Sequence, residues 1–399
     1  MCTLARNLLL VCLMIGGIAD LYASPLSKGD ALVKVKMRTD FGLPFLELTF
    51  DGGRTGLFLI DTGFDENIVD TEFAAELGLT VYNSQAVLQP GGEVEMGITE
   101  GFSFNLEEVQ LEVLAARTAP LRQFRAFIGF EFQGILGHPF IARHVLYLNF
   151  KEKMMQVFSP EKHVQGNKVR VVPIDIIANE VLVPFSIKQD SGRAYFSRLK
   201  LDTGSLSGLG FALNFYEEAN LEQTTPNSIA TTGLGGGGTT ENREFVIDLL
   251  NFAGREYRYS RAGVTIEAAG TERRTNAGTI GANILARQDL ILDYPHGRIL
   301  FGEEYPITAG IPDDNSGLWV IEQEGKKTVF RVYDHSPAAT AGLEPGDIFI
   351  RINGVPADKL TLEDIWRLCA SEPGREIVLK FKRNEETKKT VMTLQNLFR

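Results

Sequence analysis

Two short runs carry the same three residues after an apolar segment. Asp61-Thr62-Gly63 follows Leu59-Ile60, and Asp202-Thr203-Gly204 follows Leu199-Lys200-Leu201. Two carboxylates held close together cannot both ionise easily, so they share one proton and titrate as a coupled pair. Such a pair can accept a proton from a water molecule while it donates another to a developing oxyanion. The chemistry open to the two aspartates together is therefore hydrolysis of an amide bond by activated water.

The sequence around the two triplets repeats in a fixed order. A proline precedes each triplet, at Pro44 and Pro184, and an apolar segment that ends in glycine follows each, at Gly137 and Gly281. An ordered repeat of this kind indicates two copies of one structural unit. Taken singly, either aspartate would be a strand-end residue that accepts hydrogen bonds from backbone N–H groups. Within the repeat, the two aspartates predict one shared site.

The triplets and the later glycines resemble those of pepsin-like and retroviral-type aspartic proteases, over most of residues 28–304. The resemblance implies that Asp61 and Asp202 are the catalytic pair. It implies that the two threonines hydrogen-bond the backbone across the interface between two lobes. The residues expected to support the pair are Thr62, Gly63, Thr203, Gly204 and Ser205.

Two features depart from this family. Phe64 follows the first triplet, where a small residue, often serine, usually supports the outer carboxylate oxygen. Pro90–Gly97 is the expected substrate-covering hairpin of lobe one, and it lacks the tyrosine typical of pepsins. Thr231–Glu241 is the expected counterpart in lobe two. Glycine-rich hairpins can close over an extended peptide and exclude water, although each segment alone is equally consistent with an ordinary surface loop.

The pattern of apolar residues predicts a mainly β fold with two pseudo-symmetric, Greek-key-like barrel lobes that face each other across a cleft. Lobe one is assigned to residues 28–160 and lobe two to residues 168–304. Strand-like alternation dominates both lobes, as in Val33–Met37. Short helices are expected only in a few places, including Thr71–Leu79 and Asn214–Asn220.

A different domain is expected after a linker at Thr308–Ser316. Residues 316–394 resemble a PDZ domain (α+β) of the kind attached to bacterial proteases. The resemblance rests on Gly317-Leu318-Trp319-Val320, Ser336-Pro337-Ala338-Ala339, Ala341–Phe349 and Ile352-Asn353-Gly354. It implies that N–H groups of Gly317, Leu318, Trp319 and Val320 bind the carboxylate of a peptide C-terminus. The strand Val320–Gln323 would accept the peptide as an added strand.

The helix Leu362–Ala370 would form the other wall of this peptide groove. Leu362, Trp366 and Cys369 share one face of it by their i, i+4, i+7 spacing. Trp366 is either a groove residue or a core residue, and the core is favoured. Cys369 is expected to be a packed apolar residue and not a nucleophile.

The N-terminus and the charge indicate an exported protein. Arg6 and the apolar stretch Leu8–Ala19 predict a signal peptide at residues 1–23, too short to span a membrane comfortably. The alternative is a retained anchor helix, whereas cleavage would leave no stable membrane insertion. Cleavage would leave Cys369 alone, so no disulfide could form within the chain. This favours a bacterial protein of the periplasm or cell surface. The net charge of −11 argues against nucleic-acid binding.

Other chemistries find little support. The five histidines lack metal-binding spacing, so no metal site or cofactor is expected. Residues 233–238 fit Gly-x-Gly-x-x-Gly, but no apolar helical stripe follows, which argues against dinucleotide binding. His138, beside Gly137, could lie near the site, although an ordinary hydrogen-bonded histidine is favoured.

The sequence thus predicts an exported, single-chain aspartic endopeptidase that acts on polypeptides and carries a C-terminal PDZ domain for peptide C-termini. Two alternatives stay open. One is a peptide-binding scaffold on the same fold that no longer hydrolyses its ligand, which Phe64 favours. The other is a processing protease of narrow specificity that the C-terminal domain gates.

Overall fold

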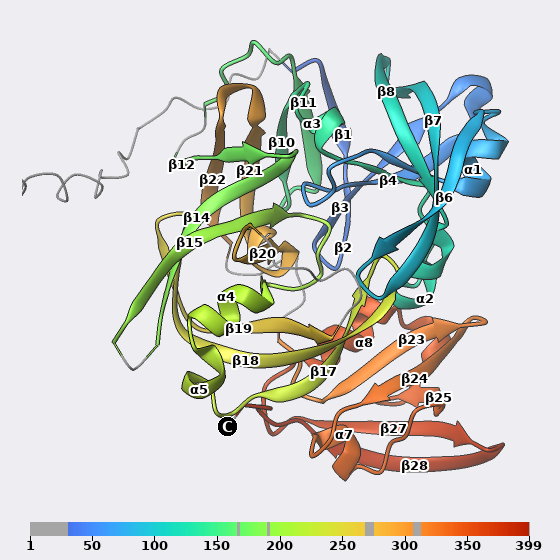
Figure 1. Cartoon of the computed structure of the whole chain (residues 1–399). Coiled ribbons are helices and arrows are strands. Elements are labelled where there is room, and N and C mark those ends of the chain that lie inside the picture. The colour runs from blue at the N-terminus through green and yellow to red at the C-terminus, as the bar shows by residue number, and fades with distance from the viewer. Residues whose placement is uncertain (1–30, 166–167, 190–191, 268–274, 306–312, 399) are drawn as a thin grey trace, which may run out of the picture.

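The computed structural model describes residues 31–165, 168–189, 192–267, 275–305 and 313–398 (Figure 1). The expected signal peptide and most of the expected linker lie outside these ranges. The described chain is mainly β, as predicted, with short helices between strands. Within the described residues, none of the helices has the length and apolar character needed to cross a membrane.

Lobe one is built on an eight-stranded sheet that closes on itself through a second pairing of β3 with β7. The order in the sheet is β2-β3-β4-β9-β5-β8-β7-β6. The strands are β2 (Arg38–Asp40), β3 (Leu43–Thr49), β4 (Thr55–Ile60), β5 (Ile68–Asp70), β6 (Val81–Gln89), β7 (Gly92–Leu106), β8 (Val109–Ala119) and β9 (Gly134–Leu136).

Lobe two repeats this topology strand for strand, in the order β13-β14-β15-β20-β16-β19-β18-β17 with a second pairing of β14 with β18. The two lobes are therefore pseudo-symmetric, as predicted. The strands are β13 (Asp175–Ile177), β14 (Glu180–Lys188), β15 (Ala194–Asp202), β16 (Leu209–Phe211), β17 (Ile229–Gly235), β18 (Gly238–Phe252), β19 (Arg255–Glu267) and β20 (Gly278–Gly281).

A third sheet joins the lobes, in the order β1-β11-β10-β21-β22-β12. Lobe one supplies three of its strands and lobe two the other three, and β10 pairs with β21 at the centre. The sequence pattern predicted two separate barrels, and the sheet that the lobes share corrects that prediction. They are β1 (Val33–Lys36), β10 (Val145–Asn149), β11 (Met154–Phe158), β12 (Arg170–Pro173), β21 (Gln288–Asp293) and β22 (Arg298–Glu304).

The helices of the lobes are short, and α1 has a side-chain cap at its start. The Asp70 carboxylate accepts hydrogen bonds from the Glu72 and Phe73 N–H groups and so starts α1. The expected helices are present, each slightly shorter than predicted. The helices of the lobes are α1 (Thr71–Glu76), α2 (Arg125–Ile128), α3 (His138–Ile141), α4 (Leu213–Glu218), α5 (Leu221–Thr224) and α6 (Ala282–Leu285), with 3₁₀ turns η1 (Asp51–Gly53), η2 (Leu121–Phe124) and η3 (Tyr294–His296).

The C-terminal domain is a small sheet with two helices, and it lies beneath both lobes in Figure 1. Strand β23 is at one edge of the sheet, beside helix α8. The elements are β23 (Leu318–Gln323), β24 (Lys326–Val332), α7 (Pro337–Thr340), β25 (Ile348–Ile352), β26 (Val355–Pro356), η4 (Ala357–Lys359), α8 (Leu362–Cys369), β27 (Glu376–Arg383) and β28 (Glu386–Thr393).

Candidate active site

The two aspartates stand at equivalent ends of equivalent strands. β4 leads into Asp61 and pairs in parallel with β9, while β15 ends at Asp202 and pairs in parallel with β20. The glycine-ending segments of the repeat thus lie beside the strands that carry the triplets. Asp61 is buried and Asp202 is partly buried, and their carboxyl groups are in hydrogen-bonding contact.

The glycines of the triplets allow this close approach. A Cβ added to Gly63 would overlap the carboxyl group of Asp202, and a Cβ added to Gly204 would overlap that of Asp61. Each lobe therefore leaves space for the carboxyl group of the other. The requirement for glycine here is steric, since neither residue has a positive φ.

The threonines lock the two loops together. The Thr62 hydroxyl donates to the Leu201 carbonyl (2.9 Å) and accepts from the Thr203 N–H (2.9 Å). The Thr203 hydroxyl donates to the Ile60 carbonyl (2.7 Å) and accepts from the Thr62 N–H (3.1 Å). All four hydrogen bonds are buried and cross between the lobes, so rotation of either loop would leave buried polar groups unpaired.

The protonation of the pair follows from its surroundings. Burial raises the pKa of Asp61 to about 8, and the neighbouring charge of Asp202 acts in the same direction. The Gly63 N–H donates to Asp61 Oδ1 (2.7 Å) and partly opposes this rise. The raised pKa favours a protonated carboxyl group at Asp61, and a pair that holds one proton is the state that acid–base hydrolysis of an amide requires.

Asp61→Asn is expected to stabilise the fold as the pH rises. The pKa of Asp61 is higher in the folded chain than in the unfolded chain, so the parent loses stability between about pH 4 and pH 8. Asparagine does not titrate, so the stability of the variant relative to the parent should increase across that range. Urea unfolding at pH 4, 6 and 8 measures this, with exposed Asp51→Asn as control. A difference between Asp61→Asn and parent that stays constant with pH would contradict the assignment.

The residues that follow the two triplets differ, as the sequence indicated. The Ser205 hydroxyl bonds the Ser207 hydroxyl (2.8 Å) and accepts from its N–H (3.4 Å). Phe64 packs against buried apolar residues, while its carbonyl accepts from the His138 N–H (2.9 Å). The residue after the first triplet therefore brings an apolar ring where lobe two has the Ser205 hydroxyl.

Lys200 is a residue near the site that sequence reasoning missed. Its side chain is only 14% exposed, and its Nζ donates to the Gly63 carbonyl of the other lobe (3.1 Å). Glu180 lies 3.6 Å from the same Nζ, and Asn276 donates to Glu180 (2.9 Å). The charge of Lys200 lowers the pKa of Asp61. A lysine inside an apolar strand, two positions before the aspartate, was the signal available in the sequence.

The two predicted hairpins are present and meet at their tips. β6 and β7 form the hairpin of lobe one, and β17 and β18 form that of lobe two. The Gly237 N–H of lobe two donates to the Pro90 carbonyl of lobe one (2.9 Å). The backbones cross so closely that a Cβ on Gly91 or Gly237 would overlap the opposite hairpin. In this state the tips are closed against each other.

His138 is a buried neighbour of the site. Its ring stacks on Tyr294 at 5.5 Å, and burial lowers its pKa. Burial also raises the pKa of Tyr294, and the charge of Asp61 adds to this rise. The ring nitrogen Nδ1 of His138 makes no hydrogen bond to the described residues. The described chain holds no group of three or more His, Cys, Asp or Glu side chains that could bind a metal ion.

A cavity of about 200 Å³ lies elsewhere in lobe one. Its lining does not include either aspartate of the triplets, so we do not place the chemistry there. The residues that line it are Thr55, Asp70, Phe73, Glu76, Arg122, Glu131, Phe132 and Gln133.

The loop expected to bind a carboxylate is already hydrogen-bonded within the C-terminal domain. The Gly317 N–H donates to the Asp314 carboxylate (2.7 Å), and the Leu318 N–H donates to the Ser316 hydroxyl (3.1 Å). Trp319 and Val320 follow in the edge strand β23. The Val320 carbonyl accepts from Trp366 Nε1 (3.3 Å).

The buried face of helix α8 differs from the predicted face at one position. Leu362, Ile365 and Cys369 are its buried residues, whereas Trp366 is partly buried and faces the Phe41 ring (5.1 Å). Trp366 is therefore a residue at the groove. Burial raises the pKa of the Cys369 thiol to about 12, which makes it a packed residue and not a nucleophile, as expected.

Comparison with known proteins identifies one part of the chain directly. Residues 328–383 match the family described as PDZ domain, so the C-terminal domain is a PDZ domain, and peptide binding is the function that this domain implies. The crystal structure of Basic 7S globulin from soybean is similar at 13% identity and a TM-score of 0.38, covering 70% of this chain and 98% of that chain. Comparison with curated proteins gave no match.

Proposed function

We propose that this chain is an aspartic endopeptidase in which Asp61 and Asp202 activate water between them. One observation carries the proposal. Two copies of one lobe bring two Asp-Thr-Gly loops together, and four reciprocal hydrogen bonds from the threonines hold the loops in register. A pair of contacting carboxyl groups with one proton is suited to acid–base hydrolysis.

The ionised and the protonated carboxyl groups of the pair have different roles in the mechanism. The ionised carboxylate accepts a proton from water as the oxygen attacks the scissile carbonyl carbon. The protonated carboxyl group donates to the carbonyl oxygen as negative charge develops there. Collapse of the tetrahedral intermediate returns a proton to the leaving nitrogen. Each proton transfer of this kind contributes about 10²- to 10⁴-fold in rate.

The substrate class follows from the two hairpins. We propose that they cover an extended polypeptide with backbone contacts, which suits their glycine-rich tips. Since the tips are hydrogen-bonded to each other here, the Gly237–Pro90 contact has to break before a chain can enter. Apolar side chains near the scissile bond are expected, by analogy with the pepsins.

We also propose that the protein is exported to the periplasm or cell surface. The support lies in the N-terminal sequence. Arg6 is followed by the apolar stretch Leu8–Ala19, and Ala23 stands at the expected cleavage point. The PDZ domain would bind polypeptide C-termini there, either to recruit substrate or to gate the protease.

The alternative is a protein that binds peptides without hydrolysing them. Phe64 favours it, because this position brings no hydroxyl to the outer oxygen of Asp61. Incubation of the purified protein with a diverse peptide library from pH 3 to pH 8 separates the two functions. Internal cleavage by the parent, absent in the double variant Asp61→Asn/Asp202→Asn, supports the endopeptidase. Retention of peptides with no cleavage at any pH would support the binding protein.

Lys200→Met is expected to move the activity window toward higher pH. The lysine charge lowers the pKa of Asp61, so removing that charge lets the pair hold its proton at higher pH. Lys200→Arg keeps the charge and should leave the profile near that of the parent. The measurement is the pH dependence of kcat/KM for one cleaved peptide. A lower rate with an unshifted profile would mean that Lys200 only supports the loop.

A further inference from the structure

The edge of the PDZ domain to which a peptide would add is in contact with lobe one. In a PDZ domain, a peptide adds as a strand to the edge of the sheet, beside the helix. Here that edge is β23 and that helix is α8, and the lobe-one helix α2 packs against both. The proximity of α2, α8 and β23 can be followed in Figure 1.

Aromatic contacts join lobe one to β23, β24 and α8. The Phe127 ring of α2 lies 5.5 Å from the Trp319 ring and 5.6 Å from the Phe330 ring. On the helix side, Phe41 of lobe one packs against Trp366, and its N–H donates to Glu363 Oε2 (3.0 Å). Such aromatic pairs stabilise a contact beyond the area that they bury.

The buried core continues from lobe one into the PDZ domain. A single cluster of buried apolar residues includes Ile128 of α2 together with Leu318 and Val320 of β23. Next to α2, a Cβ on Gly129 would lie 3.6 Å from the Leu362 side chain. This is the packing of a domain interior and not a loose surface contact.

The polar groups that a peptide would need are also engaged. The Asp314 carboxylate accepts from the Gly317 N–H, where a C-terminal carboxylate would bind. Trp366 Nε1 donates to the Val320 carbonyl, which an added strand would use as an acceptor. A peptide therefore has to displace both lobe one and contacts within the PDZ domain.

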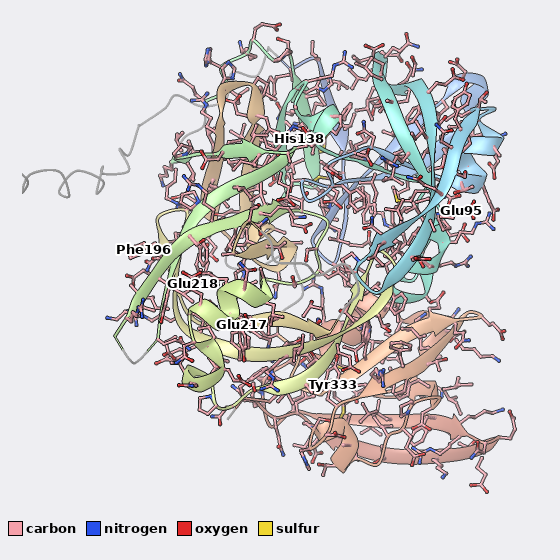
Figure 2. All side chains as sticks on the ribbon, in the orientation of Figure 1. Glu95, His138, Phe196, Glu217, Glu218 and Tyr333 are labelled. Carbon is pink, nitrogen blue, oxygen red and sulfur yellow. The ribbon has the colours of Figure 1, made fainter. Side chains whose placement is uncertain are left out.

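The segment of lobe one that packs against the PDZ domain is also hydrogen-bonded to the tip of the lobe-two hairpin. Gln123, four residues before Phe127, donates from Nε2 to the Gly236 carbonyl in the hairpin of lobe two (2.7 Å). Strand β19, which pairs with β18 of that hairpin, contacts the segment that leads into the PDZ domain, because Arg261 donates to the Asp314 carbonyl (2.6 Å). Figure 2 places Tyr333 at this boundary between lobe two and the PDZ domain.

We propose that lobe one is the resident partner of the PDZ groove, and that a polypeptide C-terminus with an apolar side chain competes with it. Binding of the C-terminus releases Phe127 from the groove and, through Gln123, loosens the tip of the lobe-two hairpin. The docking is independent of catalysis. Its use as a switch for peptide cleavage rests on the proposed function.

The two tryptophans of the chain, Trp319 and Trp366, both lie at this interface, so intrinsic fluorescence reports the groove directly. Phe127→Ala is expected to shift the emission to longer wavelength. A tryptophan-free hexapeptide with C-terminal phenylalanine should shift the parent in the same direction. It should bind Phe127→Ala about tenfold more tightly than the parent, because a competitor in the same chain acts at a high effective concentration. The amidated peptide should bind more weakly.

Phe196→Ala is the matched control, because this ring is 79% exposed on lobe two, away from the PDZ domain (Figure 2). It should leave emission and peptide affinity unchanged. Glu363→Gln is a second variant of nearly unchanged shape that weakens the bond from Phe41, together with the ion pair between Glu363 and Arg367 within α8. Equal peptide affinity for the parent, Phe127→Ala and Glu363→Gln would overturn the competition.

Amide hydrogen exchange in Ile229–Gly235 tests the link to the hairpin. Peptide, Phe127→Ala and Gln123→Ala should each accelerate exchange there, whereas Gln123→Ala should leave the tryptophan emission unchanged. Release of the groove with no change in exchange would overturn the link. Neither readout needs activity, so absence of cleavage under all conditions would overturn the proposed function and leave this inference standing.

Discussion

Asp61→Asn and Asp202→Asn are each expected to lower kcat/KM for peptide cleavage by at least about 10³-fold, because each removes one of the two proton transfers and the remaining group cannot act alone. The double variant should be little worse than either single variant, since residues that act as a unit are not additive. The measurement is cleavage of one library-derived peptide over the full pH range, so that a shifted optimum is not mistaken for loss.

The control for this prediction is that both variants still fold. Both asparagine variants keep Thr62 and Thr203 and are nearly the shape of the parent, so their folded state should be retained in urea unfolding. Activity that survives in either single variant within tenfold of the parent would exclude a shared pair. In that case the remaining carboxyl group, or another site, would have to activate the water.

Gly204→Ala is expected to abolish cleavage and to destabilise the chain by about 1–3 kcal/mol, because the new methyl group overlaps the Asp61 carboxyl group. The strain is relieved either by turning the Asp61 carboxyl group away or by moving the two loops apart, and both changes break the pair. Gly63→Ala should behave similarly, since its Cβ meets Asp202. Urea unfolding and the cleavage rate measure the two effects.

Gly208→Ala serves as a matched control a few residues away. Its Cβ would lie 3.5 Å from the Ile284 side chain, which is an ordinary contact, and Gly208 has no positive φ. This variant should remain within about 0.5 kcal/mol of the parent in stability. A Gly204→Ala variant as stable and active as Gly208→Ala would mean that the two loops do not approach as closely in solution.

The features of the site that occur in both lobes could be predicted from the sequence. Asp61 and Asp202 were identifiable because each triplet lies in the same order of landmarks, and the lobe topologies then match strand for strand. The hairpins were found from their glycines and turn residues. These features are local or repeated, so a single sequence is enough to reveal them.

Features that depend on distant contacts escaped the sequence. Lys200 gave no reason to expect a bond to Gly63 in the other lobe. Phe127 and Phe41 are ordinary phenylalanines until the PDZ domain packs against them. Spacing placed Trp366 on the buried face of its helix, but Ile365 lies there, because the packing partners of the helix decide which of two adjacent residues is covered.

The pairing of β10 with β21 in the sheet that joins the lobes has the symmetry of a dimer. Positions 144 apart are equivalent in the repeat (281 − 137), so Tyr147 in β10 corresponds to Ile291 in β21, and these two residues face each other in the ladder. A strand that meets its own copy in this way is what a symmetric dimer forms, with one surface patch used by both partners. The chain can therefore be understood as such a dimer fused into one polypeptide. The single PDZ domain docks on α2 of one half, so the two halves of the chain no longer have equivalent surroundings.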